Sequence, residues 1–428
     1  MDKINIGIIG LGVVGTGIIK VLEKNKNEIT NKFGKSIVVK AAADLDLERK
    51  RDIDLSHIHL TKNAEEIINN PDIDIIAEAI GGINPAKEFI LKAFKNKKHV
   101  VSPNKELIAK YMPELVKSAT DNGVNFLFEG AVGGGIPIIN PIRTTLSGNK
   151  ITDIFGIING TTNYILTKMK DEKADFSRVL REAQKLGFAE QDPTSDVDGF
   201  DSVYKLSILS SLAFQSYVSP QKIYRKGIRT ITIQDIEYAR TLGYTVKLVA
   251  SARNHEGAIE TMVYPTLVPD KHPLASVSNA MNAIYVCGNA VGETMFYGQG
   301  AGEMPTGSAL VGDMIEIAFH SKNCRNSDLI NSVRENSIIK EPGEIVSEFY
   351  IRFSVQDKPG VLSGISGALG NHNVSIRSAL QLDTCMEEAT LVIITHSVYY
   401  RELQAALKDI EKLSNKFEIG NVIRVGLT

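Results

Sequence analysis

The stretch GLGVVG at residues 10–15 places the strongest limit on what this chain can fold into. It follows the apolar run INIGII (4–9) and precedes the amphipathic run VVGTGIIKVLEK (13–24), which predicts a turn from a strand into a helix. In such a turn the first glycine allows the tight bend, the second lets backbone amides approach a pyrophosphate, and the third brings helix and strand together. The residues expected to bind the dinucleotide, partly through the helix N-terminus, are Gly10, Leu11, Gly12, Val13, Val14 and Gly15. The alternative is a glycine-rich connection in an α/β protein that binds no nucleotide.

The first part of the chain continues to alternate short apolar runs with helical ones. The runs SIVVKAAA (36–43), IDIIAEAI (73–80) and KHVVS (98–102) are typical of buried strands, and residues 85–94 and 112–123 of helices. Continuous apolar strands separated by helices indicate a parallel sheet that is covered on both faces. We therefore predict a doubly wound, Rossmann-type NAD(P)-binding domain over residues 1–130.

Asp44 stands at the end of the second predicted strand. A carboxylate there accepts hydrogen bonds from the adenosine ribose and disfavours a 2′-phosphate. Arg49, Lys50 and Arg51 follow closely and either offset that repulsion or form a solvated helix face. The choice between NAD and NADP therefore stays open at this stage.

The rest of the chain divides into a middle region and a separate C-terminal unit. Residues 131–322 mix glycine-rich turns, helices and strands, which predicts an α+β domain, and the polar residues 323–346 form a connector. Residues 347–428 show strand, helix, two strands, helix and strand in that order. This order predicts the ferredoxin-like βαββαβ motif.

The stretch GFAEQDPTSDVDGFDSVYK (187–205) gathers five carboxylates before one lysine. Asp201 and Lys205 share a helix face, and the helix sequence that follows is almost wholly apolar or hydroxyl-bearing, so it is mostly buried. Burial and a neighbouring carboxylate shift a lysine pKa in opposite directions, which suits proton exchange with an alcohol during hydride transfer. Glu190 and the other upstream acids would bind a cationic group such as a substrate ammonium. The alternative is an exposed ion pair between residues four apart.

Two further stretches carry polar groups where ligands bind. Lys105 follows a predicted strand of the nucleotide domain, at the carboxyl edge of the sheet. It is a candidate catalytic residue, unless Ser102 or Asn104 caps the next helix and leaves Lys105 exposed. The loop EGAVGGGIPI, from Glu129, offers backbone carbonyls near one carboxylate, which suits a monovalent cation or, alternatively, a hinge.

Composition excludes several classes of function. The chain has 48 Lys and Arg against 50 Asp and Glu, so a net charge of −2 gives no support to nucleic acid or membrane partners. Cys287, Cys324 and Cys385 are too far apart for a CxxC site and fit a reduced, cytoplasmic compartment. No apolar run reaches the ~18–20 residues of a membrane span.

Taken together, the motifs resemble the homoserine dehydrogenase family. The matching stretches are GLGVVG, IAEAIGG, VVSPNK, EGAVGGGIPI, IINGTTNYIL, GFAEQDPTSDVDGFDSVYKLSIL and GAGEMPTGSALVGD, in that order. The resemblance implies NAD(P)-dependent interconversion of L-homoserine and L-aspartate 4-semialdehyde, on the route to threonine, isoleucine and methionine. It also implies that residues 131–322 serve catalysis and dimerisation, in a homodimer or homotetramer.

The resemblance also implies a role for each candidate residue. Lys205 exchanges the hydroxyl proton, and Lys105 contacts substrate and nicotinamide. Glu190 binds substrate, and Asp196 and Asp201 line the site. The remaining positions approach the cofactor (Gly187 and Gly302) or bind sodium (Glu129 and the carbonyls of Val132, Gly134 and Ile136).

The stretch DKPGVLSGISGALGNHNVSI (357–376) is similar to an ACT domain, an amino-acid-sensing module. Threonine is the expected effector, and joining subunits is the alternative role for this domain. Two other functions compete with the family reading: a nucleotide and amino-acid sensor without turnover, and another two-domain amino-acid or semialdehyde dehydrogenase. A phosphorylating aldehyde dehydrogenase needs a nucleophilic cysteine, and Cys287 lies in an apolar run typical of an inert core thiol.

Overall fold

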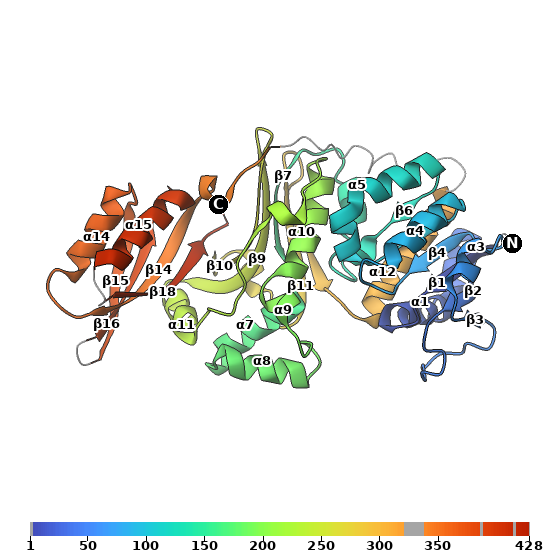
Figure 1. Cartoon of the computed structure of the whole chain (residues 1–428), viewed down its shortest axis with the longest axis horizontal. Coiled ribbons are helices and arrows are strands. Elements are labelled where there is room, and N and C mark those ends of the chain that lie inside the picture. The colour runs from blue at the N-terminus through green and yellow to red at the C-terminus, as the bar shows by residue number, and fades with distance from the viewer. Residues whose placement is uncertain (1–2, 321–337, 386–387, 414–416, 428) are drawn as a thin grey trace. The chain divides into compact units, whose positions relative to one another are not determined.

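The computed structural model describes residues 3–320, 338–385, 388–413 and 417–427 (Figure 1). Cys324 and residues 323–337 of the predicted connector therefore lie outside the described part. The chain forms two compact units: Met1–Ile154 with Tyr204–Pro220 and Met281–Ser337, and Phe155–Val203 with Gln221–Ala280 and Ile338–Thr428. Strand β7 (Ile151–Ile157) and helix α10 (Phe200–Ala213) each include residues of both units.

The first unit contains a six-stranded parallel sheet in the order β3-β2-β1-β4-β5-β6. Its strands are β1 (Lys3–Ile9), β2 (Ser36–Ala43), β3 (His59–Thr61), β4 (Ile75–Glu78), β5 (His99–Val101) and β6 (Phe126–Leu127). The order reverses beside β1, which is the switch point where open α/β sheets bind ligands. The predicted doubly wound sheet is confirmed.

Helices connect these strands and supply much of the unit's core. They are α1 (Val13–Lys24), α2 (Lys26–Phe33), α3 (Ala64–Asn69), α4 (Ala86–Lys95), α5 (Lys105–Asn122), η1 (Glu129–Ala131), α6 (Ile139–Arg143) and α12 (Glu303–His320). Helix α12 packs against α1 at glycine: a Cβ on Gly17 would lie 2.1 Å from the Glu303 carbonyl oxygen. An antiparallel hairpin, β11 (Met281–Gly288) with β12 (Gly292–Gln299), also belongs to this unit.

The second unit begins with helices and continues into a mixed sheet. The helices are α7 (Gly160–Glu172), α8 (Phe176–Lys185), α9 (Thr194–Val197), η2 (Pro220–Lys222), α11 (Ile233–Thr241) and η3 (Pro273–Ser276). The long hairpin β9 (Tyr244–His255) and β10 (Ala258–Pro269) pairs over its whole length. Two short strands, β8 (Tyr224–Arg225) and β13 (Ile338–Ile339), add to β10.

The C-terminal part of this unit has the predicted βαββαβ order, which is confirmed. Its elements are η4 (Pro342–Glu344), β14 (Val346–Gln356), α14 (Val361–Asn371), β15 (Ile376–Cys385), β16 (Glu388–Thr395), β17 (Val398–Tyr399), α15 (Tyr400–Leu413) and β18 (Phe417–Val425). Helices α14 and α15 pack on the sheet around buried Phe353, Ile365 and Ile410. Strand β18 lies between β14, to which it is antiparallel, and β10, to which it is parallel.

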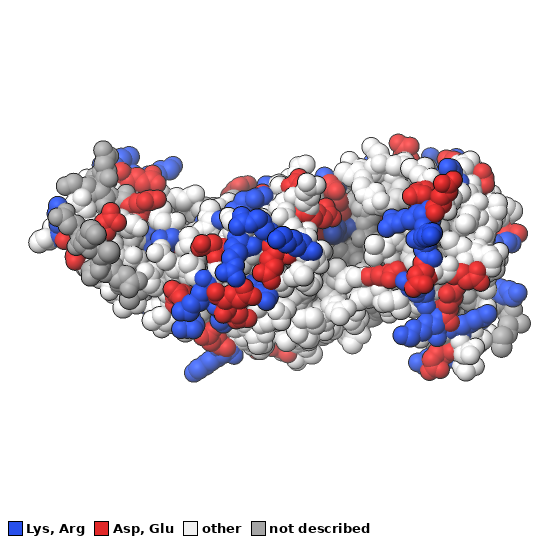
Figure 2. Space-filling model, turned by 90° about the horizontal axis from the view of Figure 1, so that it is seen from below, with Lys and Arg blue, Asp and Glu red and all other residues white. Residues whose placement is uncertain are grey.

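The charged surface is mixed in sign. On the face seen in Figure 2, basic and acidic side chains are interspersed rather than gathered into large patches of one sign. Among the described residues, no helix combines the length and the apolar character needed to cross a membrane.

Candidate active site

The glycine turn connects β1 to α1 as the sequence predicts. Gly10 has φ +103°, and a Cβ on Gly15 would lie 2.0 Å from the Gly10 carbonyl oxygen, so neither position accepts a side chain. Gly12 is the N-cap residue of α1 and has no side chain to cap the helix, and a Cβ added at this position would meet no atom within 4 Å. The first N–H groups of α1 therefore face room for an anion, which fits the pyrophosphate of a dinucleotide.

Asp44 follows β2 and contacts this turn directly. Its Oδ2 accepts a hydrogen bond from the Leu11 N–H (2.6 Å) and lies 3.4 Å from Arg51 Nη2. Arg51 also donates from Nε to the Leu11 carbonyl (2.9 Å), and its side chain is 4% exposed. The segment that carries Arg51 is not helical, so the solvated helix face considered for it is wrong, although Arg49 and Lys50 are exposed.

A buried acid organises the carboxyl ends of β4 and β5. Glu78 accepts hydrogen bonds from Ser102 Oγ (2.5 Å) and from the N–H groups of Ile80 and Gly81, and burial raises the pKa of its carboxyl. Asn104 caps α5 by accepting a hydrogen bond from the Leu107 N–H (3.2 Å). This network fixes the start of the helix whose first residue is Lys105.

A cavity of about 240 Å³ in the first unit brings several predicted residues together. It is lined by Val13, Val14, Pro103, Lys105, Gly130, Ala131, Gly134, Lys205, Gly300, Ala301, Gly302 and Thr306. The glycine turn, which we also call the nucleotide turn, and both candidate lysines therefore line the same cavity. Asn104 does cap α5, yet the half-buried Lys105 lines the cavity rather than standing as a fully exposed residue. Cys287 lies on β11 and is not among the lining residues.

Helix α10 carries Asp201 in its first turn and Lys205 one turn later. Both are buried, at 3% and 7% exposure, so the alternative of an exposed ion pair is wrong. In the second unit, Asn159 Nδ2 donates hydrogen bonds to Asp201 Oδ2 (2.9 Å) and Asp196 Oδ1 (2.7 Å). One amide thus holds two of the predicted acids together.

Gly187 and Glu190 lie on the exposed loop between α8 and α9. Gly187 has φ +77°, a left-handed conformation that favours glycine and ends the helix. The Glu190 carbonyl accepts a hydrogen bond from Gln184 Nε2 (3.1 Å).

In the loop predicted to bind a cation, the Glu129 carboxylate also holds the backbone that follows it. The Glu129 carboxylate accepts hydrogen bonds from the N–H groups of Ile138 (2.5 Å), Ile139 (2.8 Å) and Asn140 (2.6 Å), so it holds the start of α6. Burial raises the pKa of this carboxyl, and the three N–H groups oppose that shift. The carbonyls of the other three predicted ligands, Val132, Gly134 and Ile136, accept no hydrogen bond within the described part of the chain.

Sequence reasoning missed two residues that shape these sites, Asn159 and Glu78, and the buried position of a third, Arg51. Asn159 lies inside the quoted stretch IINGTTNYIL, but its contact with acids 37 and 42 positions away leaves no periodic signal. Glu78 ends the observed strand β4 but lies inside the predicted strand 73–80, and a charge within a buried run was the available sign. The buried position of Arg51 depends on an irregular segment that no pattern specifies.

A dinucleotide-binding turn and two lysines around one cavity, on a Rossmann-type sheet, define an NAD(P)-dependent oxidoreductase. The chain matches the family models "Homoserine dehydrogenase, NAD binding domain" over residues 10–129, "Homoserine dehydrogenase" over residues 137–315 and "ACT domain" over residues 349–415. The chain belongs to the homoserine dehydrogenase family, with a C-terminal ACT domain.

Full-length relatives agree with this assignment. Homoserine dehydrogenases of Bacillus subtilis and Synechocystis sp. are 40% and 42% identical, each over 99% of both chains. A crystal structure of a homoserine dehydrogenase from Thiobacillus denitrificans has a TM-score of 0.94 at 39% identity, covering 100% of this chain and 99% of that one. The predicted family, fold and enzyme class are therefore confirmed.

Proposed function

We propose that the chain catalyses the NAD(P)-dependent interconversion of L-homoserine and L-aspartate 4-semialdehyde, with Lys205 as general acid and base. The observation that carries this proposal is the cavity in which Lys105 and Lys205 lie beside the nucleotide turn. When bound, the nicotinamide accepts the hydride from the alcohol carbon. The hydroxyl proton must leave in the same reaction, and Lys205 accepts it.

The other candidate residues bind and orient. Lys105 contacts substrate and nicotinamide, Glu190 and Asp196 bind the substrate ammonium, and Asp201 lines the site. The glycine turn, Asp44, Gly187 and Gly302 hold the dinucleotide. The closeness of Asp196 and Asp201, which share the Asn159 amide as a donor, supports the ammonium role, because two neighbouring carboxylates attract a cation.

The test is homoserine-dependent reduction of NAD and NADP, measured side by side by absorbance of the reduced nicotinamide. We expect turnover with at least one of them and aspartate semialdehyde as the product. Binding of nucleotide without turnover on homoserine would instead favour a sensor. Turnover on a different hydroxy amino acid alone would favour another dehydrogenase of this architecture.

Replacing Asp44 with alanine is expected to move cofactor preference toward NADP. The carboxylate repels a 2′-phosphate, and its removal also leaves the positive charge of Arg51 without the carboxylate of Asp44 beside it. We expect the NADP-to-NAD ratio of kcat/KM to rise by at least 10-fold, with Lys32→Ala, at an exposed ion pair on α2, as the control. A ratio unchanged in Asp44→Ala would remove this residue from the ribose site.

A sodium ion at the loop of residues 129–136 is a further part of the proposal. The carbonyls of Val132, Gly134 and Ile136 fit a hard cation, whereas the Glu129 carboxylate is occupied by three backbone N–H groups and supplies charge rather than an open ligand atom. Fully buried Asn282 also supports a small bound group nearby, since neither atom of its amide has a described hydrogen-bond partner. A Cβ on Gly300, which lines the cavity, would lie 1.9 Å from that amide nitrogen.

Threonine is the proposed effector of the ACT domain, in a cytoplasmic homodimer or homotetramer. Helix α14 begins after Gly360, a left-handed residue with φ +90° that gives no side-chain cap, so its first N–H groups suit an amino-acid carboxylate. Threonine added to the full-length enzyme is expected to raise the KM for homoserine by at least 5-fold, within the usual range of allosteric coupling. Initial rates at varied homoserine, with methionine and isoleucine as comparisons, measure this effect. Indifference to all three amino acids would leave subunit assembly as the domain's role.

A further inference from the structure

Two segments of the second unit meet just before helix α10. We call residues 194–199 the acid turn, because they carry Asp196 and Asp198, and residues 224–230 the bridging segment. The Ile228 N–H donates a hydrogen bond to the Val197 carbonyl (2.9 Å), and Arg225 Nη1 donates one to the Asp198 carbonyl (3.0 Å). The backbone of the acid turn is therefore held by the bridging segment.

Gly227 makes the closest approach between them. A Cβ at this position would lie 2.1 Å from the Val197 carbonyl oxygen and 2.6 Å from the Asp198 Cα. Both neighbours are backbone atoms, so a methyl group is accommodated only if one segment moves. Gly227 does not have a left-handed φ, which means that space alone, not backbone conformation, requires glycine here.

Side chains of the bridging segment complete the contact. Arg229 pairs with the Asp198 carboxylate through two bonds, Nε to Oδ1 (2.6 Å) and Nη2 to Oδ2 (3.2 Å), and Nη2 also reaches Thr194 Oγ1 (3.3 Å). The Arg225 guanidinium lies 3.3 Å from the centre of the Phe200 ring, at the start of α10. Bidentate pairs of this kind fix orientation as well as distance.

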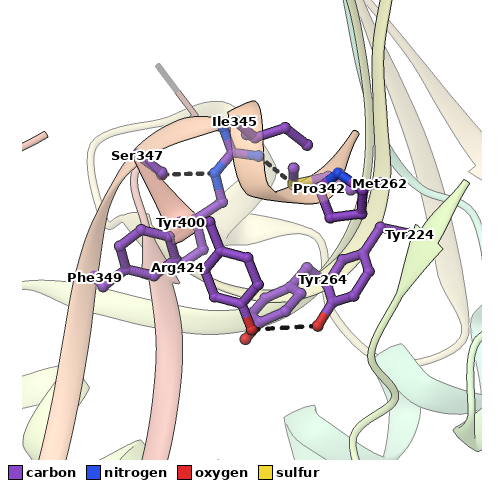
Figure 3. Close-up of a pocket in the computed structure, with 9 residues that line it drawn as sticks. All are labelled: Tyr224, Met262, Tyr264, Pro342, Ile345, Ser347, Phe349, Tyr400 and Arg424. Atoms are coloured by element: carbon purple, nitrogen blue, oxygen red, sulfur yellow. Dashed lines mark hydrogen bonds between the residues drawn. The ribbon is translucent and has the colours of Figure 1, made fainter. Parts of the chain in front are cut away.

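The same segment is held on its other side by the ACT domain. Lys226 Nζ donates hydrogen bonds to Asn421 Oδ1 (3.3 Å) and to the Val422 carbonyl (3.0 Å), and Asn421 Nδ2 donates to the Thr230 carbonyl (3.0 Å). The Tyr224 hydroxyl meets that of Tyr400 (3.3 Å), as Figure 3 shows. Every one of these contacts lies within the second unit.

We propose that the bridging segment is a positioning element for substrate binding: it fixes the acid turn, and with it Asp196, while the ACT domain holds the bridging segment in place. Asp196 shares the amide of Asn159 with Asp201, so a shift of the acid turn changes the arrangement of both acids. This inference rests on the proposed role of Asp196 in binding homoserine. Gly227 and Arg229 act through the acid turn and do not touch the substrate.

Gly227→Ala is the sharpest test, because it adds one methyl group at the contact. We expect the KM for homoserine to rise at least 10-fold, while the dissociation constant for NAD(P), measured by fluorescence titration, changes less than 2-fold. Gly148→Ala is the matched control, since a Cβ there meets nothing within 4 Å and its φ is not left-handed. A folded Gly227→Ala enzyme with an unchanged homoserine KM would overturn the proposal.

Arg229→Met and Arg229→Lys keep the proposal testable if Gly227→Ala does not fold. The methionine variant is expected to raise the homoserine KM about 3- to 10-fold, and lysine, which restores one charged contact, is expected to recover part of the loss. If Arg229→Met lowered stability without changing the KM for homoserine, the ion pair of Arg229 with Asp198 would be structural only. That result would count against the positioning of the acid turn. Arg178→Met, at an exposed ion pair with Glu172, is the control.

Lys226→Met tests the link to the ACT domain. We expect it to raise the homoserine KM in the same direction, with less than additive effects when combined with Arg229→Met, because both changes loosen one segment. If the two substitutions had additive effects on the KM, the contact with the ACT domain would act independently of the positioning of the acid turn, and the proposed link would be refuted. Asp196→Asn separates failure of the proposed substrate role from failure of positioning. If Asp196→Asn leaves the KM for homoserine unchanged, the proposed role of Asp196 fails. If Asp196→Asn raises the KM but neither Gly227→Ala nor Arg229→Met does, only the positioning role of the bridging segment is refuted.

Discussion

Lys205→Ala is expected to lower kcat by at least ~10²–10⁴-fold, the range that general acid–base catalysis contributes. Lys205 is 7% exposed and lines the cavity beside the nucleotide turn, so water cannot easily replace its ammonium group. The change also removes a positive charge that faces the alkoxide developing at the substrate oxygen. Binding of NAD(P) should remain nearly intact, because the residues proposed to hold the dinucleotide, the N-terminus of α1 and Asp44, belong to other parts of the chain.

Steady-state rates and fluorescence titration with NAD(P) measure both quantities. Lys117→Ala is the control, since Lys117 is 76% exposed and pairs with Asp121 on the same helix. We expect its kcat to equal that of the unaltered enzyme. A Lys205→Ala enzyme that keeps a tenth of normal turnover would remove this lysine from the proton transfer.

Arg352→Met is expected to destabilise the second unit by about 3–5 kcal/mol, the usual cost of breaking a buried ion pair on one side. Arg352 Nε donates to Asp235 Oδ1 (2.7 Å), and Asp235 is fully buried. Asp235 also accepts hydrogen bonds from Tyr350 (3.3 Å) and Asn421 (3.1 Å), and it caps α11 together with Thr232. Loss of the guanidinium leaves the carboxylate charge buried without its cation.

Urea unfolding followed by circular dichroism measures the change in the free energy of unfolding. Arg377→Met is the matched control, because its pair with Glu348 is partly exposed and should contribute less than about 1 kcal/mol. The double variant Arg352→Met with Asp235→Asn should recover part of the loss, since it removes both charges. If Arg352→Met lowered the free energy of unfolding no more than Arg377→Met does, the buried ion pair would not be the main contact that holds α11 to the ACT domain.

The strands and turns of the first unit could be predicted because local sequence specifies them. Helix α1 and strand β2 have the predicted bounds, since apolar periodicity and glycine spacing act over a few residues. Helix α2 was not anticipated: its sequence KNEITNKF has one buried residue, Ile29, and its mean polarity resembles that of a loop. Periodicity detects a helix through its buried face, and α2 buries too little to show one.

The site was predictable in its residues but not in its contacts. Lys105 and the glycine turn converge because a parallel sheet gathers loops at one edge, which is a rule of topology. Lys205 lines the same cavity from helix α10, which is not part of that sheet. The use of the Glu129 carboxylate as an acceptor for the start of α6 follows instead from the path of one irregular loop. Similarly, Arg352 and Asp235 are 117 residues apart, and neither sequence neighbourhood indicates the other.

The position of β18 between β10 and β14 has a consequence during protein synthesis. Strand β10 ends at Pro269, yet its parallel neighbour is the last described strand, residues 417–425. At ~5–20 residues per second, a ribosome needs roughly 8–30 s to make the intervening chain, and an unpaired strand edge invites association with other nascent chains. A chain that lacked Arg424 and Val425 would lack both of the residues that pair with Thr266 and Leu267 of β10. Strand β10 therefore gains these two partners only long after its own synthesis, from a strand that also pairs with β14.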